Sequence, residues 1–68
     1  MLEFGSKIKE LRAEKGLTQA QLAKALNLSL GTIAKYEVNS IQPSPSVLLD
    51  IAKFFNITLD ELFDYENN

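Results

Sequence analysis

Residues 18–37 constrain the fold more than any other part of this chain, because they predict two short helices joined by a tight turn. The segment reads TQAQLAKALNLSLGTIAKYE. Thr18 and Gln21 have the spacing of a capping box, in which each side chain accepts a hydrogen bond from a backbone N–H that the helix leaves free. Apolar residues then recur at helical spacing, namely Leu22, Ala23 and Leu26. The first half of the segment is therefore predicted to be a short helix with a defined start.

A turn is expected next, at Asn27, because asparagine adopts the left-handed backbone conformation at lower cost than most residues. Ser29 offers the N-cap of a second helix, and Ile33 and Tyr36 lie on one face of that helix. A helix held out from a domain by a short turn can enter the major groove of DNA. The segment thus predicts a helix-turn-helix over about residues 18–37 and indicates DNA binding.

Apolar spacing predicts another helix before this motif. Phe4, Ile8 and Leu11 lie at positions i, i+4 and i+7, and Gly16 is expected to end the helix. After the motif, residues 38–45 read VNSIQPSP. Two prolines so close together prevent a helix or an inner strand, so we expect a loop there.

Two more helices are predicted in the last third of the chain. Ser44 followed by Pro45 is a helix start signal, and Asn56 is expected to end that helix. Thr58 and Glu61 then form a second capping box. No run of alternating polar and apolar residues indicates a sheet. The predicted fold class is all-α, with five short helices around one core in a single domain of 68 residues.

The residue types that are missing exclude several kinds of chemistry. The 68 residues include no cysteine and no histidine, which excludes disulfides, histidine-dependent nucleophiles and the usual zinc ligand sets. No carboxylate pair is placed for a pocket in so small a domain. We therefore predict no enzymatic activity, no metal, no cofactor and no small-molecule ligand. With no charged-then-apolar leader and no long apolar run, the chain is expected in the cytoplasm and not in a membrane.

The charges are unevenly distributed along the chain. The net charge is −2, with six basic against four acidic residues in positions 1–40 and one basic against five acidic residues in positions 41–68. A weakly basic first half and an acidic second half suit a module that meets phosphates with one end only. Ordinary solvated surface charge gives the same pattern, so charge alone leaves both interpretations open.

Several separated motifs agree with one known family. The series GLTQAQLAKALNLSLGTIAKYE, then Pro43-Ser44, then NITLDELF, resembles the phage-repressor-type helix-turn-helix domain (Cro-like, XRE family) over about residues 4–64. The resemblance implies a five-helix fold of the lambda-repressor type. It also implies a repressor that binds double-stranded DNA at a palindromic operator as a homodimer. In such dimers the two recognition helices lie about one DNA turn apart, roughly 34 Å.

The resemblance also assigns residues to the DNA contact. The implied DNA-binding set is Thr18, Gln19, Ser29, Leu30, Gly31, Thr32, Lys35 and Ser40. Gln19 falls where members of the family clamp a phosphate, at a helix N-terminus that Thr18 caps and that would reinforce the anion site. Arg12 and Glu37 fall where some relatives form a salt bridge, which we expect here as part of the scaffold.

Parts of the recognition surface depart from the family pattern. Leu30 and Gly31 stand where many relatives place Arg, Gln or Asn to read bases. Three roles stay open for Leu30: a contact with thymine methyl groups, a protein interface, or an ordinary surface residue. The loop of residues 38–40 lacks the basic residue with which relatives grip phosphate. We therefore expect lower phosphate affinity and a shallower salt dependence than in a typical member.

An acidic and aromatic segment, residues 54–66, predicts a protein interface. Phe54 and Phe55 are adjacent in it and cannot both face the same core. We expect an exposed apolar patch there that forms a dimer interface. Its predicted residues are Ile57, Leu59, Phe63 and Tyr65. The same segment favours an alternative function, a protein-interaction module such as an antitoxin or an assembly partner.

Overall fold

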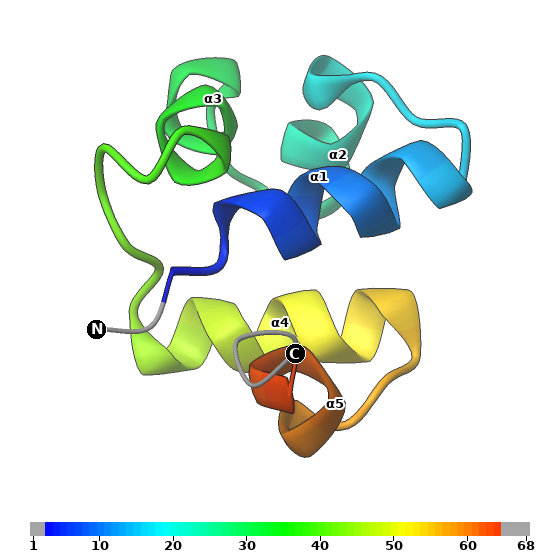
Figure 1. The fold of residues 1–68 in the computed structure, drawn as a ribbon. Helices are drawn as coiled ribbons and strands as arrows, with labels where there is room; N and C mark the ends of the chain where they lie inside the picture. The colour runs from blue at the N-terminus through cyan, green and yellow to red at the C-terminus, as the bar shows by residue number, and fades with distance from the viewer. Residues whose placement is uncertain (1–2, 65–68) are drawn as a thin grey trace.

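The computed structural model describes residues 3–64 and contains five helices in that range. They are α1 (Gly5–Glu14), α2 (Gln19–Ala25), α3 (Leu30–Glu37), α4 (Pro45–Phe55) and α5 (Leu59–Asp64). In the view of Figure 1, α2 and α3 lie on one side of α1, and α4 and α5 lie on the other. The predicted all-α fold with five short helices is confirmed. No helix within residues 3–64 is long and apolar enough to span a membrane.

Local capping signals explain where α2, α4 and α5 begin. Thr18 Oγ1 accepts a hydrogen bond from the Gln21 backbone N–H at 3.0 Å, and Gln21 Oε1 accepts one from the Thr18 N–H at 2.8 Å. Thr58 and Glu61 make the same reciprocal pair before α5, at 2.9 and 3.0 Å. Ser44 caps α4, with proline at the start of the helix. Both predicted capping boxes are confirmed, and each N-cap contributes about 1 kcal/mol.

Left-handed residues produce the sharp turns between the helices. Gly16, Asn27 and Asn56 have φ angles of 68°, 59° and 57°, at the three places where the sequence predicts a turn or a helix end. Asn39 also has a φ of 61° just after α3, although the sequence predicts only a loop there. Asparagine tolerates this conformation because its short polar side chain can hydrogen-bond locally. The chain therefore reverses within a few residues of each of these positions.

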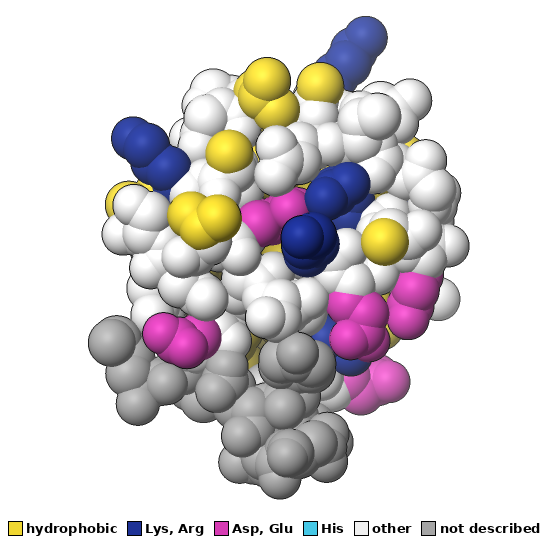
Figure 2. Space-filling view, turned by 45° about the horizontal axis from the view of Figure 1, so that its top comes forward, with side chains coloured by type: hydrophobic (Ala, Val, Ile, Leu, Met, Phe, Trp, Pro, Cys, Tyr) yellow, Lys and Arg dark blue, Asp and Glu magenta, His cyan; other side chains and the backbone are white. Residues whose placement is uncertain are grey.

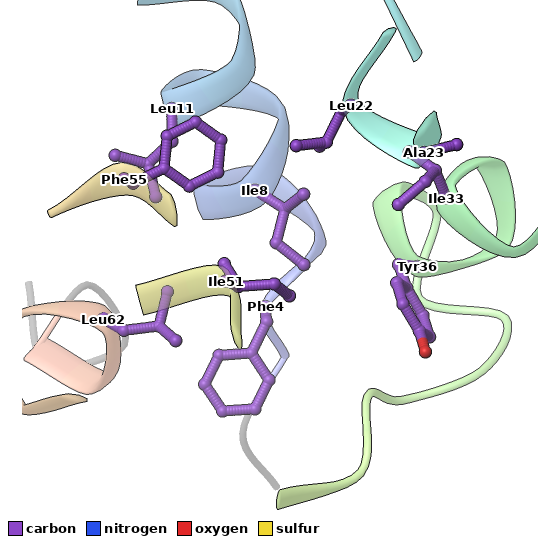
Figure 3. Packing of buried hydrophobic residues seen from close by; sticks show 10 residues of the cluster. All are labelled: Phe4, Ile8, Leu11, Leu22, Ala23, Ile33, Tyr36, Ile51, Phe55 and Leu62. Carbon is purple, nitrogen blue, oxygen red and sulfur yellow. The ribbon is translucent and has the colours of Figure 1, made fainter. Parts of the chain in front are cut away.

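One wholly buried side chain from each helix forms the centre of the core. These are Ile8, Leu22, Ile33, Ile51 and Leu62, each with an exposed fraction of 0%. Figure 3 shows them with the neighbouring buried side chains of the same cluster. The five helices thus share a single hydrophobic core, which fixes the helix-turn-helix to the rest of the domain.

The adjacent aromatic residues of α4 have different environments, as the sequence predicts. Phe55 is buried in the core, whereas Phe54 is half-buried at its edge, and their ring centroids are 5.0 Å apart. Lys15 Nζ lies 5.3 Å from the centroid of the Phe54 ring, within the range of a cation–π contact. The lysine therefore covers part of the ring that the core leaves exposed.

The first turn of α1 lies directly against the end of α3. The Gly5 N–H donates a hydrogen bond to Asn39 Oδ1 at 3.0 Å. A Cβ on residue 5 would lie 2.5 Å from the Glu37 carbonyl oxygen and 2.7 Å from the Tyr36 carbonyl oxygen. Real Cβ atoms essentially never come so close to another heavy atom, so this packing depends on glycine. The contact holds the C-terminal end of α3 against α1.

Candidate nucleic-acid interface

One face of helix α3 is held against the core (the locked inner face), and the opposite face is exposed to solvent (the open face). Ile33, Tyr36 and Glu37 are buried on the inner side. On the outer side, Leu30 has an exposed fraction of 51%, and Lys35 is also exposed. Figure 2, in which the top of Figure 1 comes forward, shows hydrophobic and basic side chains spread over this part of the surface. The open face is therefore the part of α3 that is available to a partner.

The structure places the predicted DNA-binding residues at or near the surface around α2 and α3. Thr18, Ser29, Leu30, Gly31, Lys35 and Ser40 are exposed, while Gln19 and Thr32 are half-buried. All except Ser40 lie within or at the start of one of these two helices, and Ser40 follows α3 in the loop. The predicted set thus forms part of the helix-turn-helix surface and does not enter the core.

The hydroxyl groups at the start of α3 are already hydrogen-bonded within the protein. Ser29 Oγ accepts a hydrogen bond from the Thr32 backbone N–H at 3.1 Å, which confirms Ser29 as the N-cap of the helix. Ser29 Oγ and Thr32 Oγ1 also lie 2.8 Å apart, so one hydroxyl donates to the other. The second hydroxyl keeps its hydrogen for another acceptor, such as a phosphate oxygen.

A salt bridge joins α1 to the end of α3, as the family resemblance implies. Arg12 Nε donates to Glu37 Oε2 at 2.6 Å, and Arg12 Nη2 donates to Glu37 Oε1 at 3.1 Å. The exposed fractions of the two side chains are 16% and 3%. Arg12 Nη1 also donates to the Leu17 carbonyl oxygen at 2.8 Å. The bidentate pair therefore ties together α1, the chain leading into α2, and α3.

Gln19 belongs to the same hydrogen-bond network, which the sequence does not reveal. Its Nε2 donates to Glu37 Oε1 at 3.0 Å. The amide nitrogen carries two N–H groups, and this hydrogen bond uses one of them. Glu37 thus holds the side chain of Gln19 in one orientation while the second N–H stays available to an acceptor.

The environment of Glu37 keeps this network ionised. Burial alone would raise the pKa of Glu37, but hydrogen bonds from Arg12 and Gln19 and the charges of Arg12 and Lys9 together lower this pKa below its ordinary value. The hydrogen bond with Glu37 raises the pKa of Arg12, against the opposing effect of burial. Both partners are therefore charged at neutral pH.

Lys9 is a residue of this surface that the predicted set omits. It lies on α1 three residues before Arg12, its side chain is exposed, and its charge acts on Glu37. Basic and acidic side chains lie together near the centre of the face shown in Figure 2. The signal in the sequence is the i, i+3 spacing of Lys9 and Arg12, which places both on one helix face.

An apolar groove lies between α4 and α5, with a volume of about 210 Å³. Its lining residues are Pro45, Leu48, Leu49, Leu59 and Phe63. Two of the predicted interface residues, Leu59 and Phe63, therefore line it, whereas Ile57 is half-buried against the core. Tyr65 lies outside the described residues. Leu49 has an exposed fraction of 45% and extends the apolar surface beyond the predicted set.

Comparison with known proteins gives consistent similarities. The family pattern described as helix-turn-helix matches residues 8–62. The chain is 43% identical over 65 residues to the HTH-type transcriptional activator BcrR of Enterococcus faecalis, covering 96% of this chain and 32% of that protein. It is 40% identical over 63 residues to the HTH-type transcriptional regulator MJ0272 of Methanocaldococcus jannaschii, covering 93% of this chain and 96% of that protein. The chain thus spans about a third of the first relative and nearly all of the second.

The fold is also similar to a solved protein–DNA complex. The crystal structure of the P22 c2 repressor protein in complex with synthetic operator 9T aligns with a TM-score of 0.81 and 25% sequence identity. The alignment covers 93% of this chain and 96% of that one. The likeness therefore extends over nearly the whole length of both chains.

Proposed function

Because this chain belongs to the helix-turn-helix family of transcriptional regulators, in its phage-repressor (XRE) branch, we propose that it represses transcription as a homodimer on a palindromic DNA operator. The observation that carries the proposal is the division of α3 into a locked inner face and an open outer face. A helix held in this way can be inserted into the major groove without disturbing the core.

In the proposed complex, the open face of α3 reads the bases. Leu30 would contact thymine methyl groups, which are apolar and lie in the major groove. Lys35 would contact a guanine or a phosphate, and Gly31 would let the backbone of α3 approach the DNA closely. One of the two hydroxyl groups of Ser29 and Thr32 donates to the other, and the remaining hydroxyl hydrogen would be donated to a phosphate or a base edge.

Backbone phosphates would be held from α2 and from the loop after α3. The hydrogen bond from Gln19 to Glu37 fixes the orientation of the Gln19 amide and leaves its second N–H available to an acceptor. This arrangement supports the phosphate contact that the family resemblance implies. Thr18 Oγ1 accepts the Gln21 N–H and keeps its own hydrogen for a phosphate oxygen. Ser40 is exposed in the loop and would add a neutral donor.

We propose that the homodimer forms through the groove between α4 and α5. Leu49, Leu59 and Phe63 line this groove, and Leu49 is also exposed. Burying such a surface against a second copy would remove apolar area from water. We include Ile57 and Tyr65 in this interface from the sequence. The same groove supports the second candidate function, a module that binds another protein, because any apolar partner helix would cover the same side chains.

A protein of this kind would act on the chromosome in the cytoplasm and would catalyse no reaction. The family with which it aligns consists of transcriptional regulators and is not a class of enzymes. The proposed activity is therefore binding alone, with regulation arising from occupancy of the operator.

Titration against the DNA that flanks its own gene tests the proposal. We expect the whole chain to prefer an inverted repeat over a random duplex, and we expect Lys35→Ala and Gln19→Ala to weaken binding. Lys53→Ala is the matched control, since this lysine is exposed in the last turn of α4 and lies outside the proposed contact. If the wild-type chain shows no preference over random duplex even at low salt, the regulator proposal is wrong. A tight complex with a protein encoded by a neighbouring gene would then favour the second candidate.

A further inference from the structure

Three residues of α1 form a stripe that runs beside the end of α3. Gly5, Lys9 and Arg12 are four and three positions apart, so they share one face of the helix. The first and last of them contact α3 directly. Gly5 packs against the Glu37 and Tyr36 carbonyl oxygens, and Arg12 holds the Glu37 carboxylate. Lys9 therefore lies between two fixed points along the C-terminal end of α3.

The charges at this place do not cancel. Glu37 contributes one negative charge, whereas Arg12 and Lys9 contribute two positive charges, so the group carries a net charge of +1. The Glu37 carboxylate already accepts two hydrogen bonds from Arg12 and one from Gln19. Lys9 is exposed, and its charge acts on the Glu37 carboxylate that holds the Gln19 amide, so its ammonium group is the surplus cation of this group.

We propose that Lys9 binds the same DNA backbone phosphate as Gln19, so that α1 supplies the cation for this phosphate contact. The inference rests on the proposed DNA-binding function. Gln19 would provide a directed N–H and Lys9 a mobile point charge on a long side chain, which is the usual division between an amide and an ammonium group at a phosphate.

The loop after α3 makes this assignment more specific. Residues 38–40 are Val38-Asn39-Ser40 and carry no positive charge. In this chain the cations near the C-terminal end of α3 therefore come from α1 and not from the loop of residues 38–40. A salt-dependent contact at this end of the helix-turn-helix should consequently be lost by changing a residue of α1.

The experiment uses the whole chain and a duplex of about 24 base pairs, selected by the wild-type protein from a random pool. Affinity is measured by fluorescence anisotropy between 50 and 200 mM salt for wild type, Lys9→Ala, Lys9→Arg and the control Lys53→Ala. Losing one phosphate contact should reduce the slope of log affinity against log salt by about 0.9. We expect this reduction for Lys9→Ala only, with an unchanged melting temperature because the side chain is exposed.

A second arm identifies the phosphate. Single phosphates of the selected duplex are replaced by neutral methylphosphonates, and each duplex is titrated with wild type, Gln19→Ala and Lys9→Ala. One replacement should weaken the wild type and cause little or no further loss in either variant. If Lys9→Ala and Gln19→Ala respond to different phosphates, or if Lys9→Ala retains the wild-type slope, the inference is wrong while DNA binding stands. If the wild-type chain selects no duplex at all, the proposed function fails, and the inference fails with it.

Discussion

Replacing Gly5 by alanine should destabilise the domain, although alanine is the better helix former. The new Cβ would lie 2.5 Å from the Glu37 carbonyl oxygen, whereas ordinary van der Waals contact begins at 3.4 Å. About 0.9 Å must therefore be opened between α1 and the end of α3. The opposing atoms include two backbone oxygens, which cannot rotate away as the end of a flexible side chain could.

The magnitude follows from three contributions. Overpacking of this kind costs about 1–3 kcal/mol, and stretching the hydrogen bond from the Gly5 N–H to Asn39 costs about 1 kcal/mol more. Against these, the helix propensity of alanine recovers up to about 1 kcal/mol. The free energy of unfolding should fall by about 1–3 kcal/mol. For a domain of this size, each kcal/mol lowers the melting temperature by roughly 4–8 °C.

The assay is thermal and urea unfolding followed by circular dichroism, with Gly31→Ala as the matched control. Gly31 also lies in a helix, but a Cβ there would meet nothing closer than Ser29 Oγ at 4.0 Å. Alanine at this position should raise the free energy of unfolding by up to about 1 kcal/mol. If Gly5→Ala is as stable as the wild type or more stable, α1 does not pack against α3 as described, and the reasoning is refuted.

Three further predictions concern the network and the open face of α3. Glu37→Ala should lower the free energy of unfolding by about 3 kcal/mol, because Arg12 would keep a largely buried charge without its partner. Urea unfolding measures this change. A change no larger than the experimental error would contradict a structural role of the Arg12–Glu37 salt bridge. The free energy of unfolding should also fall in acid, because the pKa of Glu37 is lower in the folded protein than in the unfolded chain. The ionised carboxylate therefore stabilises the fold at pH values above its unfolded pKa of about 4.3. This stabilisation is lost as the pH falls through the pKa of the folded protein. Urea midpoints between pH 7 and pH 3 test this, and Glu37→Gln should show a weaker pH dependence than the wild type. Leu30→Ala should leave the melting temperature almost unchanged, since the side chain is half exposed. It should weaken binding to a selected duplex that contains the contacted thymine. On a duplex with uracil in place of that thymine, which lacks the methyl group, Leu30→Ala should bind as well as the wild type. An equal loss on both duplexes would exclude the methyl contact.

Much of the fold can be predicted from the sequence because its signals are local. Thr18 with Gln21, and Thr58 with Glu61, are three residues apart, and each pair fixes a helix start without help from the rest of the chain. Asn27 likewise produces its turn through its own backbone preference. The spacing of apolar residues then determines which side of each helix enters the core.

The site is less predictable because its contacts join distant parts of the chain. The hydrogen bond from Gln19 to Glu37 spans 18 residues, and the one from Gly5 to Asn39 spans 34. Neither residue pair has a spacing that helical periodicity can detect. The i, i+3 spacing of Lys9 and Arg12 places both on one face of α1, but it does not show that this face lies near Glu37 on another helix. Only the Arg12–Glu37 pair is anticipated, through the family resemblance.

The two faces of α3 have a consequence for how operator preference can change. The side chains that hold the helix, Ile33, Tyr36 and Glu37, are separate from the exposed Leu30 and Lys35. In the proposed complex, substitutions on the exposed side would therefore alter base contacts while the attachment of the helix stays the same. If the proposed contacts hold, a chain of 68 residues would acquire a new target sequence one substitution at a time without passing through unfolded variants. The same separation makes the domain a practical scaffold for selecting altered DNA specificity in the laboratory.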